Sequence, residues 1–199
     1  MRILKKRAEA TDLFFPLLHQ NRVKNPHGLI EWIEMAGKLK VGIFSFSCCE
    51  DSSIVFVELL NEHYKEWLKL VDFRYARILQ TKNDPTGLDV AFVEGAVANE
   101  KDRQKVLDIR KNSKKVVAIG SCACNAQPAG QRNMFDEETK REIQFIVDKF
   151  KMAPKVESIP EVIKVDDLVA GCPMDENHFI AVLNKYLEEF GIVEKTAKA

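Results

Sequence analysis

The sequence predicts one α/β domain in which helices cover both faces of a mostly parallel β-sheet. From Lys40 onward, apolar runs of strand length alternate with longer segments whose apolar residues recur every three or four positions. Strands that alternate with helices are typical of a parallel sheet, because each connection crosses back over one face of the sheet. The chain has 199 residues, 46% of them apolar, which suffices for such a core and an N-terminal extension.

We expect residues 1–39 to form the extension and residues 40–199 to form the α/β domain. The extension is expected to hold a short helix near residues 8–15 and a turn at residues 25–28. It is rich in apolar side chains for so short a segment, which favours docking either on its own domain or on a partner subunit. These side chains belong to Leu13, Phe14, Phe15, Leu17, Leu18, Ile30, Trp32 and Ile33.

The first strand and helix of the domain are expected directly after the extension. Residues 41–46 read as a buried strand. Asp51, Ser52 and Ser53 follow it, and their short oxygen-bearing side chains are expected to cap a helix by satisfying its free amides. The spacing of apolar residues along this helix predicts a buried face made of Val57, Leu60, Tyr64 and Trp67.

The remaining elements continue the alternation. A weaker second strand is expected at residues 77–79, before a turn at residues 83–87 that contains Asn, Asp, Pro and Gly. The other predicted strands cover residues 89–95, 115–120 and 162–165, and the other predicted helices cover residues 100–112, 136–150 and 175–190.

Charge and hydropathy exclude several classes of partner. The chain carries 30 basic and 30 acidic residues, so it lacks the positive surplus that binds nucleic acid or anionic lipid. Its apolar runs fall short of the roughly 20 residues needed to cross a bilayer, so we expect no transmembrane segment. The N-terminal residues show no export-signal pattern, and we therefore expect a cytoplasmic location, where thiols stay reduced.

Five cysteines stand in three tight groups, each after a predicted strand. Cys48 and Cys49 are adjacent, Cys122 and Cys124 are two residues apart, and Cys172 precedes a proline. Because the loops after parallel strands meet at one edge of the sheet, cysteines distant in sequence can meet there. Four thiolates at that edge predict a metal or iron–sulfur site. The odd number of cysteines argues against a disulfide framework.

Three sequence blocks carry a resemblance to a known family. They are Phe-Ser-Phe-Ser-Cys-Cys-Glu at residues 44–50, Phe-Val-Glu-Gly at 92–95 followed by Ile-Gly-Ser-Cys-Ala at 119–123, and Gly-Cys-Pro at 171–173. With them, residues 40–190 resemble the small, electron-transfer subunit of [NiFe] hydrogenases and the 20-kDa subunit of NADH:quinone oxidoreductase (complex I). The resemblance implies a flavodoxin-like fold. It also implies one [4Fe–4S] cluster, which relays electrons to or from a large catalytic subunit.

The resemblance also implies which cysteines bind the cluster. Hydrogenase small subunits usually begin their cluster motif with Cys-x-x-Cys, but here Ser52 stands where the second cysteine belongs, and ligation by its hydroxyl is the weaker reading. The adjacent pair instead resembles the tandem cysteines of the complex I subunit, which can both bind one cluster where the backbone is locally strained. The implied ligands are Cys48, Cys49, Cys122 and Cys172, with Cys124 as the alternative to Cys48.

Six further residues are expected beside the cluster. Its negative charge favours helix N-termini, and a proline after the last cysteine suits the first turn of a helix. Glycines let the backbone approach the cluster closely. Each of two acidic residues serves either the cluster or an ordinary hydrogen-bonding role, since a buried carboxylate needs a partner. These cofactor-binding candidates are Glu50, Glu94, Gly95, Gly120, Gly171 and Pro173.

Three alternatives remain open at this point. The serine-rich loop after the first strand could hold the phosphate of FMN at a helix N-terminus. A structural zinc site is a second reading, although adjacent cysteines fit its usual spacing poorly. The third is a structural subunit without a cluster. The leading reading predicts no catalytic residue in this chain, a [NiFe]-hydrogenase-like large subunit as partner, and further electron-transfer subunits.

Overall fold

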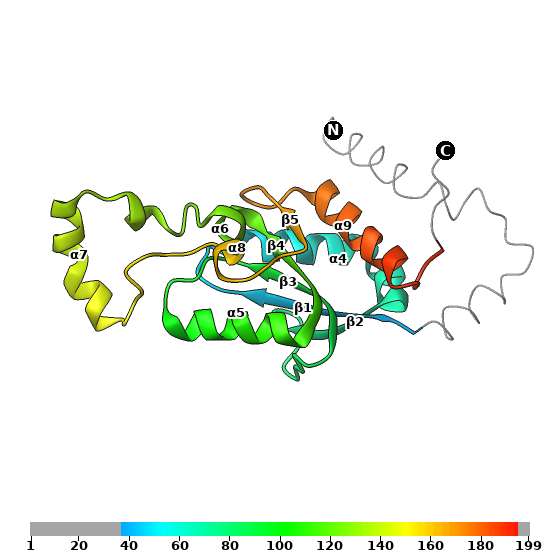
Figure 1. Ribbon diagram of the computed structural model, residues 1–199. Helices are drawn as coiled ribbons and strands as arrows, with labels where there is room; N and C mark the ends of the chain where they lie inside the picture. Colours follow the sequence, from blue (N-terminus) through cyan, green and yellow to red (C-terminus); the bar gives the residue numbers. More distant parts are fainter. Residues whose placement is uncertain (1–36, 195–199) are drawn as a thin grey trace, which may run out of the picture.

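The fold is an open, all-parallel β-sheet with helices on both faces (Figure 1). It is seen in a computed structural model that describes residues 37–194, so the elements expected in residues 1–36 lie outside the described residues. The strand order β2-β1-β3-β4-β5 is the flavodoxin-like order. The predicted fold class is therefore confirmed.

The elements have the following bounds. The strands are β1 (Leu39–Ser45), β2 (Val71–Ala76), β3 (Leu88–Glu94), β4 (Ser113–Ile119) and β5 (Asp167–Val169). The described helices are α4 (Asp51–Leu70), α5 (Glu100–Asn112), α6 (Gly120–Asn125), the 3-10 helix η1 (Gln131–Met134), α7 (Glu137–Lys149), α8 (Ile159–Val162) and α9 (Glu176–Glu189).

Two apolar cores lie on opposite faces of the sheet. On one face α4 and α9 pack against the central strands, and on the other α5, α6 and α8 do so. Aromatic rings join α4, α9 and β3 in the first core, with Phe179 of α9 centred 6.0 Å from Phe56 of α4 and 4.9 Å from Phe92 of β3. This packing holds the carboxyl ends of the strands in fixed positions along one edge.

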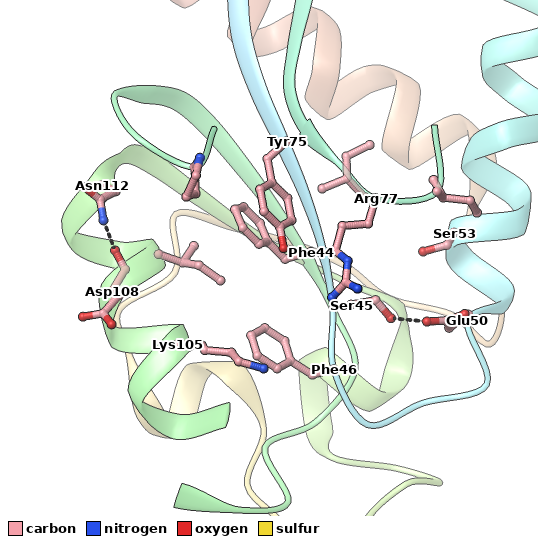
Figure 2. Close-up of a pocket in the computed structure, with 14 residues that line it drawn as sticks. Phe44, Ser45, Phe46, Glu50, Ser53, Tyr75, Arg77, Lys105, Asp108 and Asn112 are labelled. Carbon is pink, nitrogen blue, oxygen red and sulfur yellow. Dashed lines mark hydrogen bonds between the residues drawn. The ribbon is translucent and has the colours of Figure 1, made fainter. Parts of the chain in front are cut away.

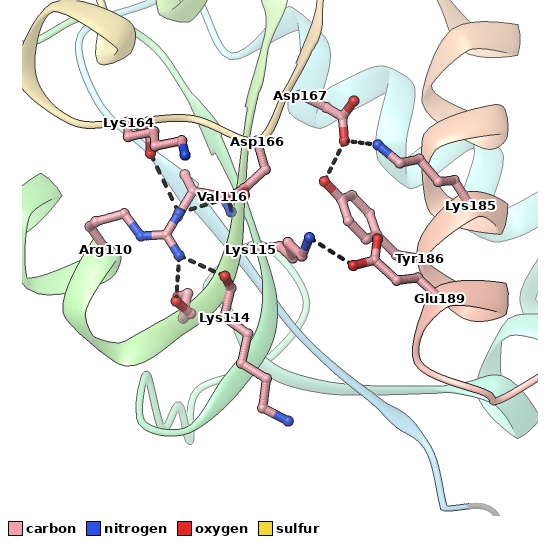
Figure 3. Close-up of polar contacts among 11 residues, drawn as sticks. Arg110, Lys114, Lys115, Val116, Lys164, Asp166, Asp167, Lys185, Tyr186 and Glu189 are labelled. Carbon is pink, nitrogen blue, oxygen red and sulfur yellow. Dashed lines mark hydrogen bonds and ion pairs between the residues drawn. The ribbon is translucent and has the colours of Figure 1, made fainter.

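The short edge strand β5 is held by charged side chains (Figure 3). The carboxylate of Asp166 accepts hydrogen bonds from the Arg110 guanidinium at 2.7 Å and from the Val116 amide at 2.8 Å. The carboxylate of Asp167 accepts from the Lys185 ammonium at 2.6 Å and from the Tyr186 hydroxyl. These contacts fix β5, which leads into the loop of the last cysteine, against β4 and α9.

The second strand lies earlier than predicted. It follows α4 directly at Val71–Ala76, whereas residues 77–79 form a turn in which Ile78 and Leu79 are exposed. The Asn83 side chain accepts a hydrogen bond from the Ala76 amide at 2.7 Å, which removes that amide from the ladder and turns the chain.

The predicted strand at residues 162–165 is also wrong. Val162 ends the short helix α8, and the strand forms only at Asp167–Val169. Glu161 reaches back to the Ser158 amide at 2.7 Å, the reciprocal contact of a capping box. The Ser-x-x-Glu pattern at residues 158–161 favours the start of a helix, and this preference prevailed over the strand that the apolar residues after it favoured.

The buried face of α4 is rotated relative to the prediction. Trp67 is buried as expected, but Tyr64 is 46% exposed, and Val57 and Leu60 are only partly covered. The side chains that face the sheet are instead Val55, Phe56, Leu59, His63 and Trp67. The apolar residues of this helix outnumber the positions on its inner face, so spacing alone did not select among them.

We expect Trp67→Ala to destabilise the fold by about 3–5 kcal/mol, because the indole is 1% exposed and its removal leaves a cavity between α4 and α9. Urea unfolding followed by circular dichroism measures this change. The matched control is Leu68→Ala, since Leu68 is 50% exposed on the same helix and should shift stability by less than about 0.5 kcal/mol. Equal losses in the two variants would contradict the packing described.

Candidate functional site

Four of the five cysteines line one hollow at the carboxyl edge of the sheet. They reach it from separate loops, after β1, after β4 and after β5. We call it the cysteine hollow. Its lining consists of Cys48, Cys49, Asp51, Ser52, Glu94, Gly120, Ser121, Cys122, Gly171, Cys172 and Pro173. The structure thus brings together the four cysteines singled out from the sequence.

The four thiols differ in their exposure. Cys122 is 6% exposed, at the start of α6, whereas Cys49 and Cys172 are exposed at the mouth of the hollow. Cys48 is partly covered, and its sulfur lies 3.6 Å from the Ser45 hydroxyl. The hollow therefore has a closed inner end and an outer end open to the surface.

Cys124 lies apart from this group. Its thiol points to the Ala118 carbonyl at 3.5 Å and packs with the core beneath α5 and α8, and it is not part of the lining of the hollow. Residues 120–125 form the short helix α6, where the sequence suggested a loop. Because residues two apart on a helix face different directions, α6 turns Cys122 toward the hollow and Cys124 away from it.

Two thiols of the hollow, those of Cys48 and Cys122, have raised pKa values. Burial, together with the nearby negative groups of Glu94 and Cys122, raises the pKa of the Cys48 thiol to about 11. Burial also raises the pKa of the Cys122 thiol, and Cys49, Cys172 and Glu94 add to that rise as neighbouring negative groups. Such crowding favours a bound cation or cluster, which would stabilise the thiolates.

Glu94 joins the sheet to the first helix. Its carboxylate is 3% exposed and accepts hydrogen bonds from the amides of Ser52 at 3.0 Å and Ser53 at 3.1 Å, and from the Ser53 hydroxyl at 2.5 Å. The predicted capping of α4 by Asp51, Ser52 and Ser53 is therefore wrong. The helix begins after Glu50 with no side-chain cap, because a carboxylate from β3 already satisfies its free amides.

Close contacts between loops shape the inner end of the hollow. Gly120 has a φ of 78°, and a Cβ there would stand 2.6 Å from the Ser52 hydroxyl oxygen. That hydroxyl in turn accepts a hydrogen bond from the Met174 amide at 3.3 Å. The Ser121 amide donates to the Gly171 carbonyl at 2.6 Å. The glycine positions thus let the three loops approach one another.

The other candidates take different places. Gly95 has a φ of 86° and lies against the backbone of Phe46, outside the lining of the hollow. Pro173 lines the hollow in a turn just ahead of α9, which begins at Glu176, close to the predicted start of that helix at residue 175. Glu50 has a left-handed backbone with φ 64° and accepts from the Ser45 hydroxyl at 3.0 Å, outside the hollow.

A larger groove lies beside Ser45, the last residue of β1 (Figure 2). Its volume is about 690 Å³, and Phe44 and Tyr75, with ring centroids 4.3 Å apart, form part of its wall. It exists because residues 77–87, between β2 and β3, contain no helix to cover this part of the sheet. Glu50 lies at this groove.

The donors that line the hollow are four cysteines, and thiolates are the usual protein ligands of iron–sulfur clusters. Within residues 37–194, no three His, Cys, Asp or Glu side chains are spaced to hold one metal ion. A cubane cluster is larger than one ion, so the four thiolates that bind it lie farther apart than those that bind a single ion. The hollow measures about 10 Å³, the size of one water probe, so a group larger than one ion would require its lining side chains to move.

Sequence reasoning missed three contributors to this site. Ser53 holds Glu94, while Asp51 and Ser121 line the hollow. Their position next to the cysteine motifs was a signal for Asp51 and Ser121. The bond between Ser53 and Glu94 joins residues 41 apart in the chain and had no local signature.

The fold and site define a flavodoxin-like α/β domain with a four-cysteine hollow at the carboxyl edge of its sheet. Comparison with known families agrees with this class, since residues 48–186 match the family described as NADH ubiquinone oxidoreductase, 20 Kd subunit. The chain therefore belongs to the family of the 20-kDa subunit of NADH:ubiquinone oxidoreductase. The resemblance seen in the sequence is confirmed.

Individual relatives are named as hydrogenase subunits. One of them, from the vhu F420-non-reducing hydrogenase of Methanocaldococcus jannaschii, is 30% identical over 73% of this chain and 56% of its own length. NAD-reducing hydrogenase HoxS subunit delta of Cupriavidus necator is 24% identical over 74% of this chain and 78% of its own length. The chain spans about half the length of the F420-non-reducing hydrogenase subunits it matches.

Solved structures share the fold. A chain in the crystal structure of an NAD⁺-reducing [NiFe]-hydrogenase in the H2-reduced state superposes with a TM-score of 0.65 at 21% identity, covering 77% of this chain and 93% of that one. The Ni-Fe-Se hydrogenase of Desulfomicrobium baculatum gives 0.55 at 16% identity over 74% of this chain and 61% of that one. Over residues 37–194, the helices are too short or too polar to cross a membrane.

We expect Glu94→Gln to destabilise the metal-free protein by about 1.5–3 kcal/mol, because a neutral amide replaces the acceptor of charge-assisted hydrogen bonds at the start of α4. Urea unfolding measures the loss. Asp175→Asn is the control, since Asp175 caps α9 by accepting from the His178 amide at 2.7 Å and Asn caps about as well. A loss no larger than that of the control would show that the Glu94 charge contributes little.

Thiol labelling tests the exposure and pKa of the cysteines. In the reduced, metal-free protein, iodoacetamide should modify Cys49 and Cys172 before Cys48 and Cys124, whose pKa values burial raises to about 11. At pH 8 only about one in a thousand of such thiols is ionised, and their labelling should rise about tenfold per pH unit up to pH 9. Peptide mass spectrometry reads the order, and early labelling of Cys48 would contradict it.

Proposed function

We propose that the chain is an electron-transfer subunit that carries one [4Fe–4S] cluster in the cysteine hollow. The observation that carries the proposal is the gathering of four cysteines from three distant loops at one sheet edge. Thiolates are the usual protein ligands of such clusters. The family membership, and relatives named as hydrogenase subunits, support the same reading.

In this proposal Cys48, Cys49, Cys122 and Cys172 hold the cluster. Cys124 receives less support as the alternative to Cys48, because its thiol donates to the Ala118 carbonyl at 3.5 Å and does not line the hollow. Ligation by Ser52 receives less support, because its hydroxyl, in a residue 3% exposed, accepts from the Met174 amide at 3.3 Å. The left-handed backbone of Glu50, directly after the tandem cysteines, supports this reading, since ligation by an adjacent pair is expected where the backbone is locally strained.

The chain's own residues would set the surroundings of the cluster, which when bound supplies one-electron transfer. Buried Cys122 anchors the inner end of the hollow and excludes water there. The loop contacts at Gly120, Ser121 and Gly171 keep the ligand loops together. Glu94 keeps the start of α4, and with it the Cys48–Cys49 loop, in place.

The partner in this proposal is a [NiFe]-hydrogenase-like large subunit, with further electron-transfer subunits beyond it. A cluster relays electrons only when it lies close to the next centre, so that subunit would cover the exposed Cys49 and Cys172. The chain alone would not turn over hydrogen, since the catalytic centre belongs to its partner. The proposal places the complex in the cytoplasm, where thiols stay reduced.

The alternatives receive less support. The FMN reading needs free amides at the start of α4, but those of Ser52 and Ser53 already donate to Glu94. The zinc reading needs cysteines spaced for one ion, which the described residues do not provide. The reading without a cluster leaves the gathering of four thiols unexplained. Anaerobic absorbance with iron, sulfide and zinc analysis separates all four readings.

The ligand assignment predicts a sharp difference between neighbouring cysteines. Under anaerobic expression, Cys48→Ala, Cys122→Ala and Cys172→Ala should each lose the cluster, whereas Cys124→Ala, two residues from Cys122, should keep about four irons per chain. Iron and sulfide content and the electron-paramagnetic signal of the reduced protein measure this. Cluster loss in Cys124→Ala with retention in Cys48→Ala would reverse the assignment.

A further inference from the structure

Residues 131–152, which we call the arm, carry apolar side chains outside the core. The arm consists of η1, α7 and the turn after it, and Figure 1 shows α7 standing away from the sheet. None of the α7 side chains is buried in the part of the chain that the structure describes. Met134, Phe145 and Phe150 are 70%, 68% and 65% exposed, and such side chains mark interaction surfaces.

The base of the arm is held firmly although its end is uncovered. The Arg132 guanidinium donates to the carbonyls of Ala153 at 2.6 Å and Pro154 at 3.1 Å. The Asn133 side chain donates to the Val156 carbonyl at 2.7 Å and accepts from the Val156 amide at 2.8 Å. The start of the arm is therefore tied to the residues that follow it, at the base from which α7 projects.

The same base is joined to the edge that carries the cysteine hollow. Val97 and Glu157 exchange backbone hydrogen bonds of 2.8 and 2.9 Å, and the Ala153 amide donates to the Ala98 carbonyl at 2.8 Å. Val97 and Ala98 follow Glu94 by only a few residues. The arm also leaves the domain just after α6, which carries Cys122. In Figure 1, β1 points toward the side from which α7 projects.

We propose that the arm is a docking element for the large subunit that covers the cysteine hollow. The inference rests on the proposed function, because that function requires a subunit seated over Cys49 and Cys172. A subunit in that position would lie beside the arm, because the base of the arm and the cysteine hollow are at the same edge of the sheet. Ile146 of α7 and Phe150, which caps the end of α7 four residues later, would bury their side chains in an apolar depression of that subunit. The charged residues of α7 would form the rim.

The test uses the complex of this chain with its large subunit, purified anaerobically through a tag on the large subunit. Phe150→Glu should weaken retention of this chain at least tenfold, because the charge must be buried at the contact. Leu68→Glu is the matched control, since Leu68 is 50% exposed on α4 near the opposite end of the strands. Iron content and the electron-paramagnetic signal are measured on each variant chain alone.

The outcomes separate the two proposals. The docking role is supported if the Phe150→Glu chain keeps its cluster but loses its large subunit. The Leu68→Glu control should keep both. Retention of the large subunit by Phe150→Glu would overturn it. A photoreactive benzoylphenylalanine in place of Phe145 adds a direct readout, and a cross-link to a second copy of this chain would also overturn it. A wild-type chain without cluster or large subunit would instead refute the proposed function.

Discussion

The buried carboxylate of Glu94 is the contact on which the site depends. It sits at the end of the central strand β3 and accepts from two amides and a hydroxyl at the start of α4. A carboxylate with almost no solvent contact is stable only when its acceptor positions are filled, so strand, helix and loop must assemble together. These three hydrogen bonds fix the start of α4, and with it the end of the loop that carries Cys48 and Cys49.

The hollow and the groove near Ser45, the last residue of β1, differ in the groups that line them. On one side four thiols and Glu94 concentrate groups that can carry negative charge. On the other side an aromatic groove remains open, because the chain from β2 to β3 forms no helix. Ser45 lies between the two, within hydrogen-bonding reach of both the Cys48 sulfur and the Glu50 carboxylate. The Ser45 side chain therefore contacts both Cys48, which lines the hollow, and Glu50, which lies at the groove.

The sequence was sufficient for the features that repeat locally and failed where distant residues decided the outcome. The alternation of strands and helices predicted the sheet, and α5 has the predicted bounds Glu100–Asn112 because its Asn99 cap is a local signal. The second strand was misplaced because the Asn83 side chain, reaching back to Ala76, ends it. The four thiols could be grouped by the edge rule for parallel sheets. The separation of Cys124 from them, however, depends on the turn of α6, which no spacing rule revealed.

The wide spread of the hollow's residues along the chain determines when it can form. The Ser52 hydroxyl and the Met174 amide that meet there are 122 residues apart. Contacts between residues so far apart form late in folding, because closing the intervening loop costs entropy. Pairing of the other strands first brings the two residues near each other. During synthesis on the ribosome, Cys48 and Cys49 emerge long before Cys172 is made. The thiols that appear first therefore stay without their partners until nearly the whole sheet has been translated.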